Sequence, residues 1–148
     1  MGTQTGLITV EDFLKWKDPK EDHYELHHRE VVLMPPPKWG HVLVQKRVHG
    51  LIERFVCNKR AQRVGSDDYL SGAPDLVVEV LSPGNTMYEI NDKMAVCMAN
   101  GCSSFWTVDP KSSRLSVTEA DVTRHYRLDA TFQCGLIGAN VPVREIFD

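Results

Sequence analysis

Two carboxylates lie within an apolar stretch of this sequence, and their type and spacing suggest chemistry. The stretch "GAPDLVVEVLSPGNT" spans residues 72–86 and carries Asp75 and Glu79 among valines and leucines. Burying a carboxylate without a partner costs several kcal/mol or drives the group to its neutral form. We therefore expect a cation or a donor group of the protein beside these side chains.

The alternation of side chains along a β-strand separates the acids from the apolar residues. Within residues 75–81, one face of the strand carries Asp75, Val77, Glu79 and Leu81, and the other carries Leu76, Val78 and Val80. The second face is entirely apolar. We expect helices to cover that face and the acids to point into an open cleft on the other.

The spacing of the two acids restricts how they can share a metal ion. Four residues along a strand rise about 13 Å, whereas oxygens that bind one Mg²⁺ each lie about 2.1 Å from it. Either the chain bends near Asp75, or Glu79 finds its partner carboxylate on a neighbouring strand. An alternative for Asp75 is that it only closes a turn after Pro74.

Patterns elsewhere predict the elements that position these acids. Thr9 is a candidate N-cap for a short helix in "ITVEDFLKW", and "HYELHHREVVLM" predicts a hairpin that ends at the prolines of residues 35–37. A helix from about Trp39 to Asn58 follows. Its apolar stripe, at spacings of three and four, consists of Val44, Val48, Leu51, Ile52 and Phe55.

The second half of the chain alternates between helix and strand. "EINDKMAVCMANG" predicts a helix that ends at Gly101, and "SFWTV" predicts a strand that ends at the turn "DPKSS". "RLSVTEA" and "RHYRLD" predict two more strands, and "VREIFD" a final helical turn. This order indicates a mixed α/β fold, which we expect to form a single domain over residues 1–148.

Charge is unevenly distributed along the chain. Residues 38–63 carry seven lysines and arginines against one glutamate, a local charge of +6 in a chain whose net charge is −3. Such a segment suits a surface that faces phosphates, although a solvated helix face is the alternative.

The sequence lacks the signals that are typical of zinc-binding, secreted and membrane-spanning proteins. The four cysteines form no CxxC pair, no signal peptide is recognisable, and no apolar run approaches the roughly 20 residues of a membrane helix. We therefore expect a cytoplasmic protein with reduced thiols and no membrane partner.

Several motifs together resemble the Uma family of restriction endonucleases. In chain order they are "TVEDFL", "YEL", "EVVLMPPP", "GHVLVQKRV", "APDLVVEVLSPGNT", the lysine of "NDKMAVCMANG", "FWTVDP" and "VPVREIFD". The resemblance runs nearly from end to end. It implies the PD-(D/E)XK nuclease fold, a restriction-endonuclease-like mixed sheet flanked by helices.

The resemblance also implies an activity and a set of site residues. The activity is hydrolysis of DNA phosphodiester bonds with Mg²⁺ or Mn²⁺. Glu79 would be the acid of the (D/E)XK element and a metal ligand, with Asp75 and the backbone carbonyl of Val80 as further ligands. Lys93 matches the family's relocated lysine, eleven residues after Ser82, because Leu81 occupies the usual lysine position. His41 and Gln45 would border the site.

The basic helix would contact DNA, and self-association as a homodimer is expected by analogy with nuclease folds of this size. The candidate DNA-binding residues are Lys38, Lys46, Arg47 and Arg54.

Taken alone, Lys93 is typical of a surface lysine whose stem packs down, and His41 is typical of a helix-face histidine.

One departure from the family pattern leaves alternatives open. Members usually carry a longer segment before this strand, with another strand and its own Pro-Asp, whereas here only "AQRVGSDDYLSG" intervenes. The absent strand is where the partner of Glu79 is expected, so Asp75, Asp67 or Asp68 would substitute. The alternative functions are an inactive DNA-binding or dimerising relic of the fold and a structural oligomer without a nucleic-acid role.

Overall fold

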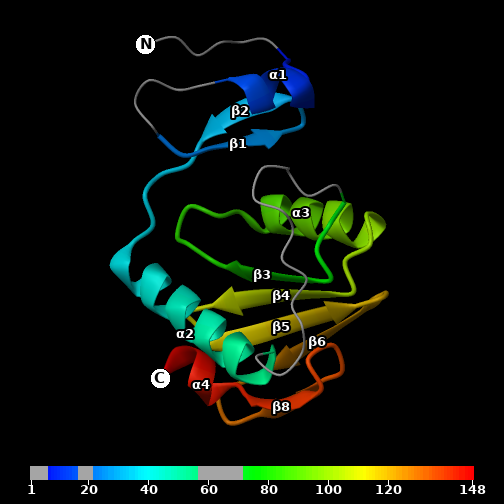
Figure 1. Ribbon diagram of the computed structural model, residues 1–148. Helices are drawn as coiled ribbons and strands as arrows, with labels where there is room; N and C mark the ends of the chain where they lie inside the picture. Colours follow the sequence, from blue (N-terminus) through cyan, green and yellow to red (C-terminus); the bar gives the residue numbers. More distant parts are fainter. Residues whose placement is uncertain (1–6, 17–21, 57–71) are drawn as a thin grey trace. The chain divides into compact units, whose positions relative to one another are not determined.

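The computed structural model describes residues 7–16, 22–56 and 72–148. Contacts divide the chain into two compact units, residues 1–37 and residues 38–148 (Figure 1). The expected single domain over residues 1–148 is not decided by this division and stays a prediction. Within the described ranges, none of the helices is long and apolar enough to cross a membrane.

A short helix opens the first unit. Helix α1 (Val10–Lys15) begins after Thr9, whose hydroxyl oxygen accepts a hydrogen bond from the Asp12 backbone N–H at 3.1 Å. This bond satisfies one of the donors that every helix start leaves unpaired. The predicted N-cap is confirmed.

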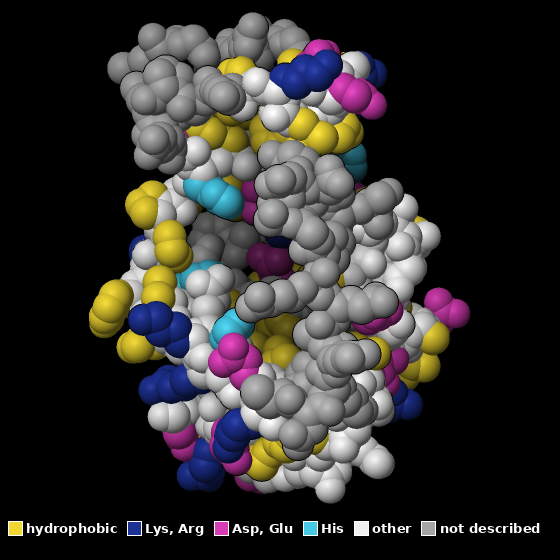
Figure 2. All heavy atoms as spheres, in the orientation of Figure 1, with side chains coloured by type: hydrophobic (Ala, Val, Ile, Leu, Met, Phe, Trp, Pro, Cys, Tyr) yellow, Lys and Arg dark blue, Asp and Glu magenta, His cyan; other side chains and the backbone are white. Residues whose placement is uncertain are grey.

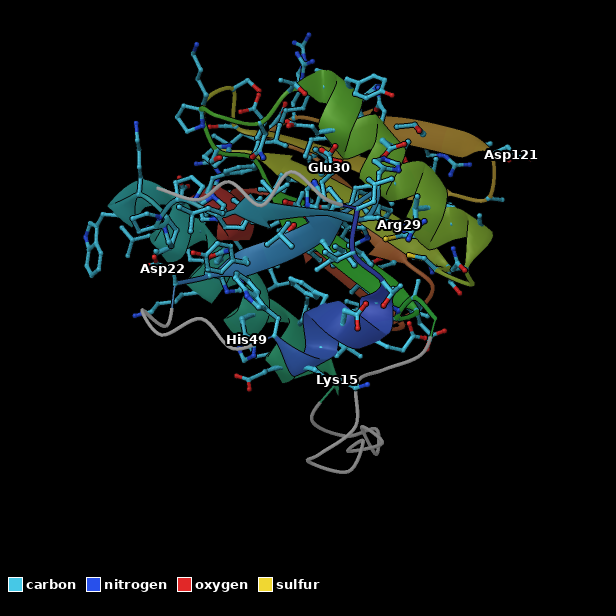
Figure 3. The ribbon with its side chains drawn as sticks, turned by 90° about the horizontal axis from the view of Figure 1, so that it is seen from above. Lys15, Asp22, Arg29, Glu30, His49 and Asp121 are labelled. Carbon is cyan, nitrogen blue, oxygen red and sulfur yellow. The ribbon has the colours of Figure 1, made fainter. Side chains whose placement is uncertain are left out.

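The hairpin of the first unit forms without glycine in its turn. Strands β1 (Tyr24–His27) and β2 (Glu30–Leu33) pair antiparallel, as predicted. The two connecting residues, His28 and Arg29, have φ of 47° and 71°, and positive φ at both central positions is what a type I′ turn needs. Figure 3 labels Arg29 and Glu30 at this turn.

The second unit is built on a mixed four-stranded sheet in the order β3-β4-β5-β6 (Figure 1). β3 and β4 run parallel, and the pairs β4–β5 and β5–β6 are antiparallel. Among the described residues, β3 pairs on one side only, which makes it an edge strand. The strands are β3 (Leu76–Val80), β4 (Ser104–Asp109), β5 (Arg114–Glu119) and β6 (Val122–Tyr126).

Helix α2 (Trp39–Val56) covers the apolar face of this sheet. Its predicted stripe is confirmed: Val44, Val48 and Leu51 are at most 5% exposed, and Ile52 and Phe55 pack against the same cluster. The side chains they meet come from the inner positions of every strand of the sheet and include Val80, Trp106, Val108, Leu115 and Val117.

Helix α3 (Met87–Ala99) makes the crossover between the parallel strands β3 and β4. Thr86 and Glu89 form a capping box at its start, and Gly101, with φ of 104°, follows its end. The expectation that the Glu79 face of the sheet would be an open cleft is therefore wrong in part. A parallel pair needs a crossover element, and α3 packs on the face that carries Glu79, opposite α2.

The last part of the chain adds a hairpin that sequence patterns did not predict. Strands β7 (Thr131–Cys134) and β8 (Ala139–Pro142) pair antiparallel, and the predicted final helical turn is α4 (Arg144–Phe147). The ring of Phe132 meets Trp106 edge-on, with centroids 5.0 Å apart. The inner residues of this hairpin, Phe132, Cys134 and Val141, close the core beneath the sheet.

We predict that Leu51→Ala lowers the free energy of unfolding by about 2–5 kcal/mol, because it opens a cavity in the core. Leu43→Ala, on the same helix, is the matched control. Leu51 is 1% exposed and Leu43 is 39% exposed, so the control should cost under about 1 kcal/mol. Urea denaturation of both variants measures the difference, and equal losses would contradict the assigned core face of α2.

Candidate active site

The side chains of β3 separate into two faces as predicted. Leu76, Val78 and Val80 join the core, and Val80 is 4% exposed. Glu79 projects from the opposite face, where α3 lies. The side chain of Val80 is thus occupied by packing, and only its backbone carbonyl could act as the predicted metal ligand.

Glu79 has a cationic partner on α3. The Lys93 Nζ donates a hydrogen bond to the Glu79 Oε2 at 3.0 Å, and the two side chains are 38% and 21% exposed. The capping box at Thr86 sets where α3 begins, and Lys93 follows the buried Ile90 by three residues. The same helical face therefore points both residues toward the sheet. This pair explains how a carboxylate is tolerated in the middle of the strand.

Both members of the pair remain accessible to solvent, which matters more than their contribution to stability. Ion pairs that water reaches add little to the free energy of folding. A carboxylate and an ammonium within hydrogen-bonding distance can, however, contact the same incoming group. The carboxylate is a ligand for a hard cation, and the ammonium is a donor for an anionic oxygen.

Cys97 lies near this pair but does not suit a nucleophilic role. Burial raises the pKa of the Cys97 thiol, and the neighbouring Cys102 and Glu79 raise it further against the opposing effect of Lys93. The thiolate is the reactive form of cysteine, so the thiol stays protonated at neutral pH. In the described part of the chain Cys97, Cys102 and Cys134 are free cysteines.

Asp75 stands just before β3 and is exposed. Its backbone carbonyl accepts hydrogen bonds from the Ser103 and Ser104 N–H groups at 2.9 and 3.0 Å, which ties the start of β3 to β4. The pairing with β4 then runs without interruption from Leu76 to Val80. The strand itself is regular, so any bend that would bring Asp75 toward Glu79 has to lie before Leu76.

The described residues do not assemble a complete metal site. They contain no group of three or more His, Cys, Asp or Glu placed to hold a metal ion, and the neighbour of Glu79 on β4 is Thr107. Mg²⁺ is commonly bound by one or two carboxylates, with waters and substrate phosphates completing its shell. The Glu79 carboxylate fits the role of one such ligand. Asp67 and Asp68, the predicted substitutes, lie outside the described residues.

His41 and Gln45, the predicted supporting residues, lie in the first two turns of α2. Gln45 is exposed, and His41 is half-buried. The His41 Nδ1 is enclosed and has no hydrogen-bond partner among the residues that the structure describes. Buried polar atoms are normally paired, so this nitrogen is the feature that favours a ligand near His41.

The four candidate DNA-binding residues of α2 divide into two kinds. Lys38 and Lys46 are exposed and face solvent. Arg47 instead donates to the Phe147 carbonyl at 2.7 Å, and Arg54 pairs with Glu145. Two of the four thus have partners on α4, and the DNA-binding role of the set stays a prediction. In Figure 2, dark-blue side chains gather over the region that α2 and α4 occupy in Figure 1.

A polar row across the sheet extends the site beyond the predicted residues. Glu79 is in register with Thr107, which is in register with Ser116, which is in register with His125. Residues in register share a face, and Ser116 Oγ lies 2.8 Å from His125 Nδ1. The sequence shows the alternation of each strand but not the register between strands, so these neighbours could not be predicted.

Comparisons with known proteins agree with this architecture. The chain is similar in structure to "a putative nuclease belonging to DUF820 from Anabaena variabilis ATCC 29413", with a TM-score of 0.80 and 17% sequence identity over 95% of this chain and 97% of that chain. At this identity the likeness shows the fold, and it confirms the predicted mixed sheet flanked by helices. No curated protein matches the chain.

The family assignment rests on a match within the chain itself. Residues 53–138, which include Glu79, Lys93 and the whole four-stranded sheet, match the family Uma2, whose description is "Putative restriction endonuclease". The resemblance that the sequence motifs indicated is confirmed, and the chain belongs to the Uma2 family.

Proposed function

We propose that the protein is an endonuclease that hydrolyses DNA phosphodiester bonds with Mg²⁺ or Mn²⁺. The observation that carries this proposal is the contact between Glu79 and Lys93 at 3.0 Å, with both side chains open to solvent. Membership of the Uma2 family supports the reaction class. Glu79 and Lys93 are the proposed catalytic residues, with Asp75 as a second metal ligand.

Each residue has a distinct task in this proposal. A divalent cation, when bound, stabilises the charge that develops on the phosphate and lowers the pKa of a bound water. The Glu79 carboxylate and the Val80 backbone carbonyl would hold the cation as hard oxygen ligands. The Lys93 ammonium has three N–H donors, so it can keep its bond to Glu79 and also donate to a phosphoryl oxygen or to the attacking water.

The charges of the proposed site suit a phosphodiester. Two carboxylates, one ammonium and a divalent cation leave one net positive charge, and a phosphodiester linkage carries one negative charge in the ground state. A further negative charge develops on the phosphate as the water oxygen bonds to phosphorus and the bond to the leaving oxygen breaks. Fixed donors aimed at that charge stabilise the transition state more than the ground state.

The small number of carboxylates favours a second function, which is DNA binding without cleavage. Among the residues that the structure describes, Glu79 has a lysine as its partner and no second acid on the adjacent strand. A domain that binds DNA without cleaving it would need no second carboxylate. Self-association as a homodimer is proposed for either function, and light scattering after gel filtration measures it.

We predict that purified protein relaxes supercoiled plasmid in Mg²⁺ or Mn²⁺ and that Glu79→Gln and Lys93→Ala each lower the rate by about 10²–10³-fold. Glu53→Gln and Lys111→Ala are the matched controls, since both residues are exposed and stand on other elements of the same unit, Glu53 on α2 and Lys111 in the β4–β5 turn. Gel electrophoresis of time points measures the rate. Equal losses in the site and control variants would contradict the assignment of Glu79 and Lys93.

We also predict that the protein binds Mn²⁺ and that EDTA abolishes cleavage. Calorimetric titration of the wild type should give heat of binding that Glu79→Gln loses and Glu53→Gln retains, because only Glu79 stands beside the proposed cation. A folded wild type that binds DNA but neither binds Mn²⁺ nor cleaves plasmid would replace the nuclease proposal with the DNA-binding domain.

A further inference from the structure

Three arginines line one pocket at an end of the sheet, outside the site described above. The pocket has a volume of about 520 Å³ and lies where β5 begins and β6 ends. Arg114 is the first residue of β5, Arg127 follows the last residue of β6, and Arg144 is the first residue of α4. Because Leu115 is in register with Tyr126, Arg114 and Arg127 are neighbours across the two strands.

The pocket keeps a positive charge. Asp129 is the acidic residue among the described lining residues. The Arg127 side chain has no hydrogen bond or ion pair with any residue in the described part of the chain. Arg144 approaches Asp148 at 3.8 Å, but both side chains are more than half exposed, and such pairs bind weakly.

Asp109, which is in register with Arg114 on the neighbouring strand, is held mainly by its own turn. Partial burial alone would raise the pKa of Asp109. Hydrogen bonds from the Ser112 hydroxyl at 2.5 Å and the Lys111 N–H at 3.0 Å, together with the charge of Arg114, hold the pKa below its usual value instead. Asp109 therefore closes the β4–β5 turn, and the exposed guanidinium of Arg114 remains available to the pocket.

Such a pocket suits a phosphate group. A guanidinium presents five N–H donors in a planar fork that matches two oxygens of a phosphate. Three forks around one concavity can surround an anion from different directions. Lysines would offer point charges without this geometry.

One arginine of the pocket, Arg114, projects from the same face of the sheet as Glu79. Arg114 is two residues from Ser116, whose register row includes Thr107 and Glu79, and it projects from the same face of the sheet. Two strand spacings and two residues along a strand separate Arg114 from Glu79, which amounts to about 12 Å between their Cα atoms. One strand of DNA has a phosphate about every 3.4 Å along the helix axis, so that distance spans at most about three or four phosphates.

The third arginine is held in place by α2. Arg47 donates to the Phe147 carbonyl, and Arg54 pairs with Glu145, so two contacts hold α4 against α2. Arg144 thus stands on an anchored helical turn. Asp121, by contrast, lies at the opposite end of the β5–β6 hairpin (Figure 3).

We infer that Arg114, Arg127 and Arg144 form a binding site for a backbone phosphate of DNA, a few nucleotides from the bond that faces Glu79 and Lys93. The inference rests on the proposed DNA substrate but not on cleavage. The polar row of Thr107, Ser116 and His125 would lie beneath the intervening backbone. This site adds phosphate contacts to any that the exposed face of α2 provides.

The test is the salt dependence of DNA binding, measured by fluorescence anisotropy of a labelled duplex in EDTA so that no cleavage occurs. Arg127→Ala should weaken binding and reduce the slope of log Kd against log salt by about one, and Arg114→Ala/Arg127→Ala by about two. Arg124→Ala is the matched control, because Arg124 is an exposed arginine of β6, three residues before Arg127 and outside the pocket lining. Arg124→Ala should leave affinity and slope unchanged, and thermal melting confirms that each variant is folded.

Each outcome decides the inference separately from the nuclease proposal. Loss of slope in the pocket variants supports the phosphate site even if plasmid cleavage fails. Equal effects of Arg127→Ala and Arg124→Ala, or no effect of either, would overturn it even if the wild type cleaves plasmid. Calorimetric binding of inorganic phosphate that Arg127→Ala abolishes, with DNA affinity unchanged, would also overturn it, because the pocket would then take small phosphates instead of DNA.

Discussion

The apolar face of β3 packs against α2, and this packing determines where the charged residues of the sheet can stand. Val80 enters the same cluster as Val44, Val48 and Trp106. Because strand side chains alternate, burying Val80 directs Glu79 to the opposite face. A slip of one residue would place the carboxylate in the core, where it would have no partner. The location of the candidate site is therefore a consequence of core packing.

The crossover from β3 to β4 supplies the other half of the site. Parallel strands cannot be joined by a tight turn, so a crossover helix must return the chain to the end of the sheet where the first strand began. α3 is that helix, and its capping box and its buried Ile90 set which side chains point toward the sheet. Lys93 falls on that face and reaches Glu79. The acid and the amine thus come from adjacent elements of one βαβ unit.

The C-terminal hairpin and α4 connect the core to the charged surface. The edge-on contact of Phe132 with Trp106 closes the core on the α2 side. Arg47 and Arg54 then join α2 to α4. Basic residues that a sequence pattern assigns to DNA are in part structural, whereas Arg114, Arg127 and Arg144 come together from three separate segments. Charge counted along the chain did not identify them, because they lie in separate segments of the sequence.

Local patterns determined most of the elements by themselves. The Thr9 cap, the apolar stripe of α2 and the alternation of β3 all act over a few residues, so they can be recognised without the fold. Motif order likewise indicated the Uma family and the pairing of Glu79 with Lys93 as site residues. The register between strands, the placement of α3 over Glu79, the short β7–β8 hairpin and the gathering of three arginines were decided by tertiary structure. Each depends on contacts between residues far apart in the chain, and such contacts are set by packing that no local pattern records.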